Sequence, residues 1–202
     1  MCVKIKKRIV MERVAEKLTN YIVSKGAISK ADYELYKYGF QTGIEMLVCV
    51  ATGLLVAVQM GMFGEGVLFF LLFFSLRSYV GGIHMDSFKA CYLLSCIVQI
   101  GVLLFGKYVP LTKNIAFIVS VCQMMFIYFI NPVENDNRPV DYKQKIFFAK
   151  RIKCTLIGIT LCTIVLYILD LNDYLNVIGS TLFMILISMI LGEYRNRRRK
   201  ME

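Results

Sequence analysis

The sequence predicts an all-α, polytopic integral membrane protein with about six transmembrane helices and an N-terminal amphipathic helix. Hydrophobic residues make up 57% of the 202 residues, and the mean hydropathy is +0.61. The apolar residues occur in long blocks rather than in amphipathic stripes, which is typical of segments that cross a bilayer. No cleavable signal peptide is evident, because the first 37 residues are basic throughout, so the first span is expected to direct insertion.

Residues 1–42 form the predicted N-terminal region, in which basic side chains surround a row of apolar ones. This pattern predicts a helix lying on an anionic membrane surface, and the alternative is a solvated helix packed on the protein's own loops. Gly26 is expected to end this helix, and Ser29 with Asp32 has the form of a capping box that opens a second helix. The apolar row consists of Val10, Val14, Leu18, Tyr21 and Ile22.

Residues 43–192 are predicted to be a bundle of six spans, followed by a basic tail at 193–202, the whole chain being a single membrane domain. Gly64-Glu65-Gly66 is predicted to be the first tight turn. The second span then has only about 15 residues, or about 22 Å of helix, which is short for a bilayer and predicts that the next loop dips into the membrane. The expected spans are 44–63, 66–80, 91–109, 115–130, 154–169 and 174–191.

The distribution of basic residues predicts the orientation. Six spans place the N-terminus, the loop at 81–90, the segment 131–153 and the C-terminus on one side, and only Lys107 and Lys113 of the 24 lysines and arginines fall on the other side. By the positive-inside rule the basic side is cytoplasmic, so both termini are expected inside a bacterial cell membrane. The net charge of +10 is then explained by anionic lipid and needs no nucleic acid as a partner.

The functional residues are expected between the second and third spans. His84 is the only histidine, and Cys91 follows it by seven residues, which in one continuous helix would separate the side chains by about 10 Å. Gly81-Gly82 is a strong break, and Asp86 or Ser87 is a good N-cap for a new helix, so His84 is predicted to lie in a loop and Cys91 near a helix N-terminus. That arrangement favours a thiolate nucleophile beside its base. The alternative is that Cys91 is only a small buried hydrophobe.

The order of residues around this pair resembles the accessory gene regulator B (AgrB) family, which are membrane cysteine endopeptidases of Gram-positive quorum sensing. The family motif is Arg, then Gly-x-His, then Cys seven residues after the His and Ser four residues after the Cys. Here these positions are Arg77, Gly82, His84, Cys91 and Ser95.

Two further stretches resemble the same family more weakly. Gln41 stands in a Gly-Phe-Gln triplet where the family often has Gly-x-Gln, and Pro132, Asn137 and Pro139 resemble its proline-bearing stretch. The segment 131–153 that holds these prolines is basic. This predicts either a binding site for an acidic peptide or a segment that only keeps the loop on the cytoplasmic side and contacts anionic lipid.

The resemblance implies that Cys91 attacks a small propeptide, that His84 acts as its base, and that a thioester passes to a peptide cysteine to close a thiolactone ring. It also implies a homodimer. Arg77, Gly82, Gln41 and Ser95 are candidates for supporting or substrate-binding roles. No cofactor is expected, and one histidine without a CxxC motif leaves too few ligands for a metal site.

The rival hypothesis is a non-enzymatic membrane transporter or binding module. In it, Glu45, Arg77 and His84 would form a polar relay, since an ionisable group inside an apolar span is by default functional or paired. For Glu45, a carboxylate that reaches the interface at a helix start is an equally good interpretation.

Overall fold

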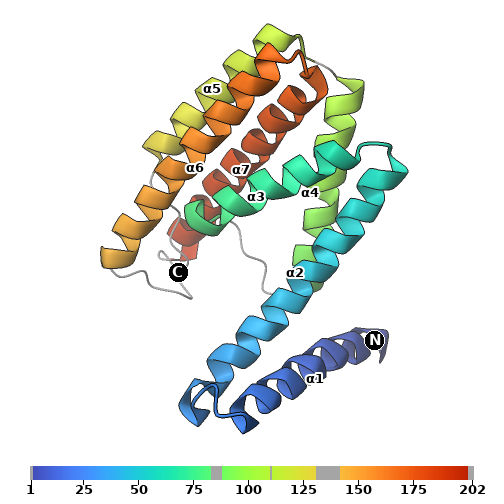
Figure 1. Cartoon of the computed structure of the whole chain (residues 1–202), viewed down its shortest axis with the longest axis vertical. Helices are drawn as coiled ribbons and strands as arrows, with labels where there is room; N and C mark the ends of the chain where they lie inside the picture. The colour runs from blue at the N-terminus through green and yellow to red at the C-terminus, as the bar shows by residue number, and fades with distance from the viewer. Residues whose placement is uncertain (1, 83–87, 110, 131–141, 200–202) are drawn as a thin grey trace. The chain divides into compact units, whose positions relative to one another are not determined.

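The computed structural model describes residues 2–82, 88–109, 111–130 and 142–199, and every regular element in these ranges is helical (Figure 1). The all-α prediction is therefore confirmed. The elements are α1 (Cys2–Ser24), the short 3-10 helix η1 (Lys30–Asp32), α2 (Tyr33–Gln59), α3 (Phe63–Val80), α4 (Phe88–Tyr108), α5 (Lys113–Phe129), α6 (Tyr142–Ile168) and α7 (Asn172–Arg199).

The helices form two compact units, and the boundary falls inside α2. The first unit is Met1–Thr52 and holds α1, η1 and the first part of α2, whereas the second unit is Gly53–Glu202 and holds the rest of the chain.

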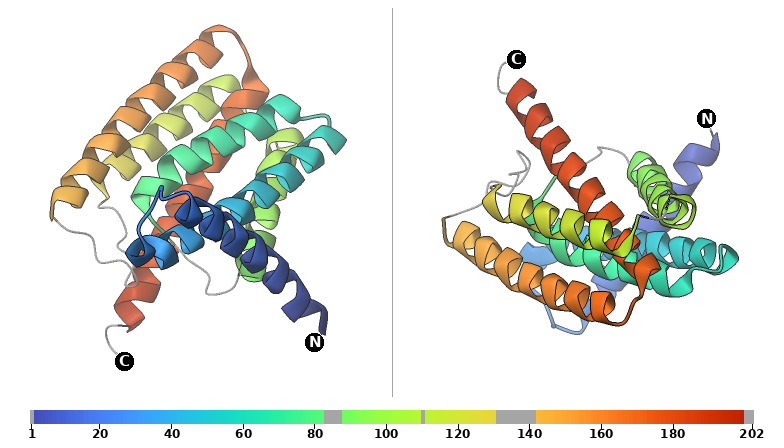
Figure 2. Two further views of the ribbon diagram at one scale, coloured as in Figure 1. Left: turned by 60° about the horizontal axis from the view of Figure 1, so that its bottom comes forward. Right: turned by 90° about the horizontal axis from the view of Figure 1, so that it is seen from above.

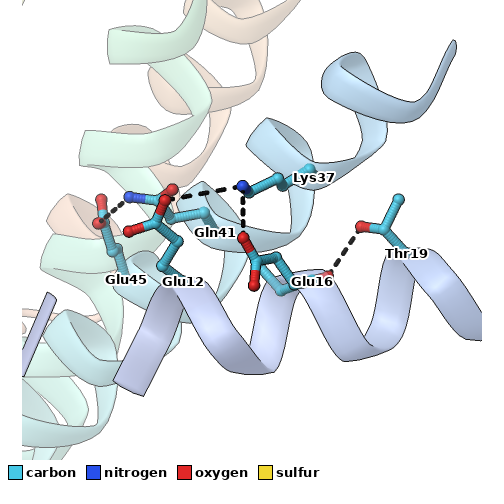
Figure 3. Close-up of polar contacts among 7 residues, drawn as sticks. Glu12, Glu16, Thr19, Lys37, Gln41 and Glu45 are labelled. Carbon is cyan, nitrogen blue, oxygen red and sulfur yellow. Dashed lines mark hydrogen bonds and ion pairs between the residues drawn. The ribbon is translucent and has the colours of Figure 1, made fainter. Parts of the chain in front are cut away.

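In the first unit, α1 and α2 are joined through a turn at Gly26, whose φ is +69°. One basic residue of α2 ties the two helices together (Figure 3). Lys37 Nζ lies 2.7 Å from Oε1 of Glu16 and 3.6 Å from Oε1 of Glu12. Both glutamates are on α1, so this α2 cation neutralises two like charges one turn apart. The pairing therefore fixes which face of α1 lies towards α2.

Three residues of the apolar row predicted on α1 are exposed. Val14, Leu18 and Tyr21 are each at least 40% exposed and Ile22 is half-buried, whereas Ala15 and Thr19 are fully buried. Thr19 Oγ1 donates a hydrogen bond to the Ala15 carbonyl at 2.8 Å, so the buried hydroxyl is satisfied within its own helix (Figure 3). The contact of α1 with a membrane surface stays a prediction.

In the second unit, α7 is the central helix, with α3, α4, α5 and α6 packed around it (Figures 1 and 2). More than half of its most apolar stretch is buried inside the protein, compared with under a third for each of the other candidate spans. Its buried apolar residues complete a core shared with α3, α5 and α6; they are Ile178, Leu182, Ile185 and Met189.

In the part of the chain that the structure describes, five helices are long and apolar enough to cross a membrane. They are Lys30–Gln59, Phe63–Val80, Ala90–Tyr108, Gln144–Ile168 and Asn172–Arg198. The span predicted at 115–130 corresponds to α5, which is apolar but has 17 residues, or about 25 Å of helix. The chain is a multi-pass membrane protein, as the sequence predicts.

The predicted turn at Gly64-Glu65-Gly66 is wrong. The chain reverses instead between the end of α2 at Gln59 and the start of α3 at Phe63, where Gly61 has a φ of +70°. Gly66 lies inside α3, and a Cβ there would come within 2.4 Å of the Ala57 Cβ, so this glycine allows two helices to approach closely. The second span is consequently 18 residues and about 27 Å long, and it is not unusually short.

The helices also extend further than predicted at two other places. The span expected at 154–169 is the end of a helix that begins at Tyr142, so the second half of the basic segment 131–153 is helical, while 131–141 lies outside the described residues. The tail predicted at 193–202 continues α7 as far as Arg199. The capping box at Ser29 is not formed as expected, because Ser29 Oγ donates a hydrogen bond to Asp32 Oδ2 at 2.7 Å and accepts none from a backbone N–H.

Three interhelical turns, at 60–62, 111–112 and 169–171, meet at one end of the second unit, which we call the turn end. Lys107 Nζ donates to the Met60 carbonyl at 3.3 Å, and Lys113 forms an ion pair with Asp170. Asn172 Nδ2 donates to the carbonyl of Leu111 at 3.1 Å. Turns that share one end are expected of spans that cross in alternating directions.

Candidate active site

Arg77 lies in the last turn of α3, directly before the predicted break at Gly81-Gly82. The break is confirmed, because α3 ends at Val80 and the two glycines follow with φ values of +74° and +132°. Such φ values are strained for any residue with a Cβ, so the chain turns here because both positions are glycine.

Gly82 is also the point at which two side chains from different helices meet. A Cβ on Gly82 would lie 2.6 Å from the Ser188 hydroxyl oxygen and 2.8 Å from Nη1 of Arg77. Arg77 comes from α3 and Ser188 from α7, which pack against each other along their length. The absence of a side chain at Gly82 therefore makes room for a guanidinium and a hydroxyl at one position.

Cys91 lies in the first turns of α4, as predicted, and its side chain is half-buried. Arg77 and Cys91 therefore lie on the two sides of the break, one at the end of α3 and the other near the start of α4. The N-terminal end of a helix and a guanidinium are both groups that favour negative charge on a sulfur close to them.

His84, Asp86 and Ser87 lie outside the described residues, so the proximity of His84 to Cys91 stays a prediction. What the structure adds is that α3 ends at Val80 and that Cys91 lies in the helix that follows, so His84 and α3 are separated by the break at Gly81-Gly82.

The remaining candidates are distributed over two places. Ser95 lies one turn after Cys91 on α4 and is half-buried. Gln41 and Glu45 belong to the first unit, where Gln41 Nε2 donates a hydrogen bond to Glu45 Oε1 at 3.2 Å (Figure 3). The carboxylate of Glu45 thus has a neutral partner one turn away on its own helix.

Ser188 is the residue that sequence reasoning missed. It stands in the last predicted span between Ile187 and Met189, and a lone serine in an apolar helix carries no local signal. Only the packing of α7 against α3 brings its hydroxyl to Gly82 and Arg77.

The part of the chain that the structure describes contains no group of three or more His, Cys, Asp or Glu residues that could hold a metal ion. Cys91 is a free thiol.

The model of the family described as accessory gene regulator B matches residues 15–192, a range that includes Arg77, Gly82, Cys91 and Ser188. The chain belongs to the AgrB family. An AgrB-like protein of Clostridium perfringens (strain SM101 / Type A) is 27% identical over 183 residues, covering 85% of this chain and 84% of its own length. AgrB-like protein 2 of Clostridium perfringens (strain 13 / Type A) is 23% identical over 189 residues, covering 90% and 87%. Both names express a likeness to AgrB and state no measured activity.

No solved structure matches the chain. Membership of the AgrB family implies that the chain takes part in processing the autoinducer of an accessory gene regulator system. It also agrees with the multi-pass membrane architecture of α2 to α7.

Proposed function

We propose that this AgrB-family protein is a membrane cysteine endopeptidase that cleaves a small quorum-sensing propeptide and passes the acyl group to a cysteine of the same peptide. The observation that carries the proposal is the placement of Cys91 in the first turns of α4 and of Arg77 in the last turn of α3, on the two sides of a glycine turn between two spans. Purely structural cysteines need no such placement.

In the first step the Cys91 sulfur attacks the carbonyl carbon of the scissile peptide bond. His84 accepts the thiol proton and returns it to the nitrogen of the leaving amine as the C–N bond breaks. The product is a thioester between Cys91 and the peptide. Arg77 stabilises the thiolate before attack, and its N–H groups are suited to the negative charge that develops on the carbonyl oxygen.

In the second step a thiol of the bound peptide attacks the thioester carbonyl. The bond from that carbon to the Cys91 sulfur breaks, a new carbon–sulfur bond closes a thiolactone ring, and the peptide thiol proton passes by way of His84 to Cys91. One thioester replaces another, so the step is close to thermoneutral. It succeeds only if water is kept from the acyl-enzyme, and the half-buried position of Cys91 at the end of a helix bundle supports this.

The end of the bundle that holds Cys91 is proposed to face the cytoplasm, with both termini on that side of the cell membrane. The support is the charge asymmetry, since Lys107 and Lys113 are the only basic residues assigned to the turn end. The exposed residues Asp173, at the turn end, and Tyr194, near the end of α7, allow a direct test. Asp173→Cys should react with a membrane-impermeant maleimide in intact cells, and Tyr194→Cys only after permeabilisation, each above the labelling of the parent. The reverse pattern would overturn the orientation.

The decisive experiment for the reaction is trapping of the acyl-enzyme. The purified protein is mixed with the candidate propeptide, quenched in acid and digested, and a thioester on the Cys91 peptide is sought by mass spectrometry. We expect the parent protein to form the adduct with the candidate propeptide and also with a propeptide variant whose ring-closing cysteine is replaced by serine. With that variant the adduct should accumulate. Cys91→Ala is the control, and an adduct of equal amount in this control would refute the mechanism.

The relay of a transporter or binding module stays an alternative, because His84, one of its three members, lies outside the described residues. Of the other members, Glu45 accepts a hydrogen bond from Gln41.

A further inference from the structure

The charged side chains of α1 are sorted by sign. Glu12 and Glu16 lie on the side that meets α2, where Lys37 Nζ is 3.6 Å and 2.7 Å, respectively, from their Oε1 atoms (Figure 3). Arg13 and Lys17 each follow one of these glutamates by one residue and are exposed. Among the described residues neither of these two cations forms an ion pair. The carboxylates are therefore neutralised by a cation of α2, whereas Arg13 and Lys17 keep their charge at the surface.

The exposed basic and apolar residues of α1 share one face. An α-helix has about 3.6 residues per turn, so each residue is rotated by about 100° from the one before it. Six exposed residues fall within an arc of about 140° on this scale, and we call them the outer face of α1. Ala15 and Thr19, which are fully buried, lie on the opposite side of the helix. In order around the arc, the outer face consists of Arg13, Lys17, Tyr21, Val14, Lys25 and Leu18.

The chemistry of the outer face fits a membrane interface. It carries three cations and no carboxylate, so its charge is complementary to anionic headgroups. Val14, Leu18 and Tyr21 supply exposed apolar surface, and Lys25 Nζ lies 5.8 Å from the centre of the Tyr21 ring. Lysine and tyrosine suit such a boundary, because each has an apolar stem or ring that enters the acyl region and a polar tip that stays among the headgroups.

The chain connection favours lipid over a soluble partner. α1 ends at Ser24, and the candidate span Lys30–Gln59 begins after a short turn. Such a short tether gives the membrane surface a high effective concentration at α1, which a partner free in solution does not have. Each cation near an anionic surface also strengthens binding about fivefold. Tether and charge therefore point to the same occupant.

We propose that the outer face of α1 binds the anionic headgroup surface of the membrane, with its three cations at the lipid phosphates and its apolar residues at the top of the acyl chains. The contact is a lipid-binding function of the N-terminal helix. It goes beyond the proposed cysteine chemistry and does not depend on it.

A tryptophan on the outer face can report this contact, because the chain has none of its own. Leu18→Trp is made in the full-length protein, which is reconstituted into phosphatidylcholine vesicles with zero to about 40% phosphatidylglycerol. Lipids brominated near the top of their acyl chains quench a tryptophan that enters the bilayer. Quenching should rise with the phosphatidylglycerol fraction and fall when about 0.5 M salt is added. Val14→Trp is a second reporter on the same face and should respond in the same way.

Two double variants with the same change in net charge separate the outer face from the charge of the whole protein. Arg13→Gln with Lys17→Gln should lower the ratio of bound to unbound α1 about 25-fold, at about fivefold per cation. Lys107→Gln with Lys113→Gln removes two cations at the turn end and should leave this ratio unchanged.

Three results would overturn the proposal. They are quenching that is absent or equal in neutral and anionic vesicles, an equal loss in the two double variants, and emission that shifts to shorter wavelength without quenching by bromine. The last result would assign the outer face to a protein surface, such as a second copy of this chain. Because no peptide is cleaved in this assay, its outcome and that of the peptidase proposal are independent.

Discussion

The two ends of the helix bundle in the second unit use polar residues in opposite ways. At the turn end, Lys107 is bonded to a backbone carbonyl, Lys113 is paired with Asp170, and Asn172 bonds to the backbone of a neighbouring turn. At the other end, which we call the site end and define by Arg77, Gly82, Cys91 and Ser188, a guanidinium and a hydroxyl lie beside a glycine turn that separates Arg77 from Cys91.

The two ends differ in the groups that they bring together rather than in strain. Polar groups at the turn end close the ends of helices, where unpaired backbone groups are costly. That end also holds the positive φ of Asp170 and two buried amide atoms, Asn172 Oδ1 and Asn176 Nδ2, that have no hydrogen-bond partner among the described residues. The site end combines a guanidinium, a hydroxyl and a cysteine, which are groups that can serve chemistry.

The largest expected effect is the loss of the nucleophile or its base. Cys91→Ala and His84→Ala should each abolish propeptide cleavage while expression and membrane insertion stay as in the parent, because the two groups act as one unit. The matched change at the turn end, Lys113→Gln, should leave the cleavage rate within about twofold, since exposed ion pairs contribute under about 1 kcal/mol. The measurement is the rate of product formation by mass spectrometry. Cleavage by Cys91→Ala would end the peptidase proposal.

A Cβ at Gly82 should have the next largest effect. Gly82→Ala introduces an atom 2.6 Å from the Ser188 oxygen and 2.8 Å from the Arg77 nitrogen, at a φ that alanine rarely adopts. Displacing the guanidinium by about 1 Å is expected to slow cleavage about a hundredfold. Gly101→Ala, on α4, is the control, because a Cβ there meets no atom within 4 Å and its φ is ordinary. Equal rates in the two variants would show that the glycine turn is not part of the site.

At the turn end, the corresponding change should reduce stability rather than activity. Asn176 is 1% exposed, and its Oδ1 accepts a hydrogen bond from the backbone N–H of Leu111 at 3.2 Å. Asn176→Ala leaves that N–H unpaired, at an expected cost of about 1–3 kcal/mol in the free energy of unfolding. Thermal unfolding in detergent measures this change, and the cleavage rate of the folded fraction should stay within about twofold. A large loss of activity in a fully folded variant would contradict the division between the two ends.

The smallest expected effect is on substrate capture by the basic N-terminal part of α6. Lys143→Glu with Lys145→Glu should raise KM about threefold to tenfold with little change in kcat, because contacts present equally in ground and transition states change binding alone. Added salt should weaken the parent in the same way. A correctly inserted double variant with unchanged kinetics would assign these lysines to topology alone.

The sequence by itself determined the class of the protein and indicated its family. Apolar blocks predict the six helices from α2 to α7, because a bilayer imposes length and hydropathy on each span separately. The Gly81-Gly82 break was equally predictable, since two consecutive glycines act on the local backbone. The family could be recognised from the sequence alone, because its motif lies within one short stretch of chain and consists of Arg77, Gly82, His84 and Cys91.

Only the tertiary structure decided which glycines turn and which pack. Gly61, Gly64 and Gly66 all stand near the first reversal, and no local rule shows that Gly61 makes the turn while Gly66 lets α3 approach Ala57. The position of Ser188 next to Gly82 and Arg77 could likewise not be predicted from the sequence. Arg77 belongs to α3 and Gly82 to the turn after it, far from Ser188 along the chain. Backbone conformation and hydropathy act locally and can be recognised in the sequence, whereas a contact between side chains of α3 and α7 exists only after both helices have packed.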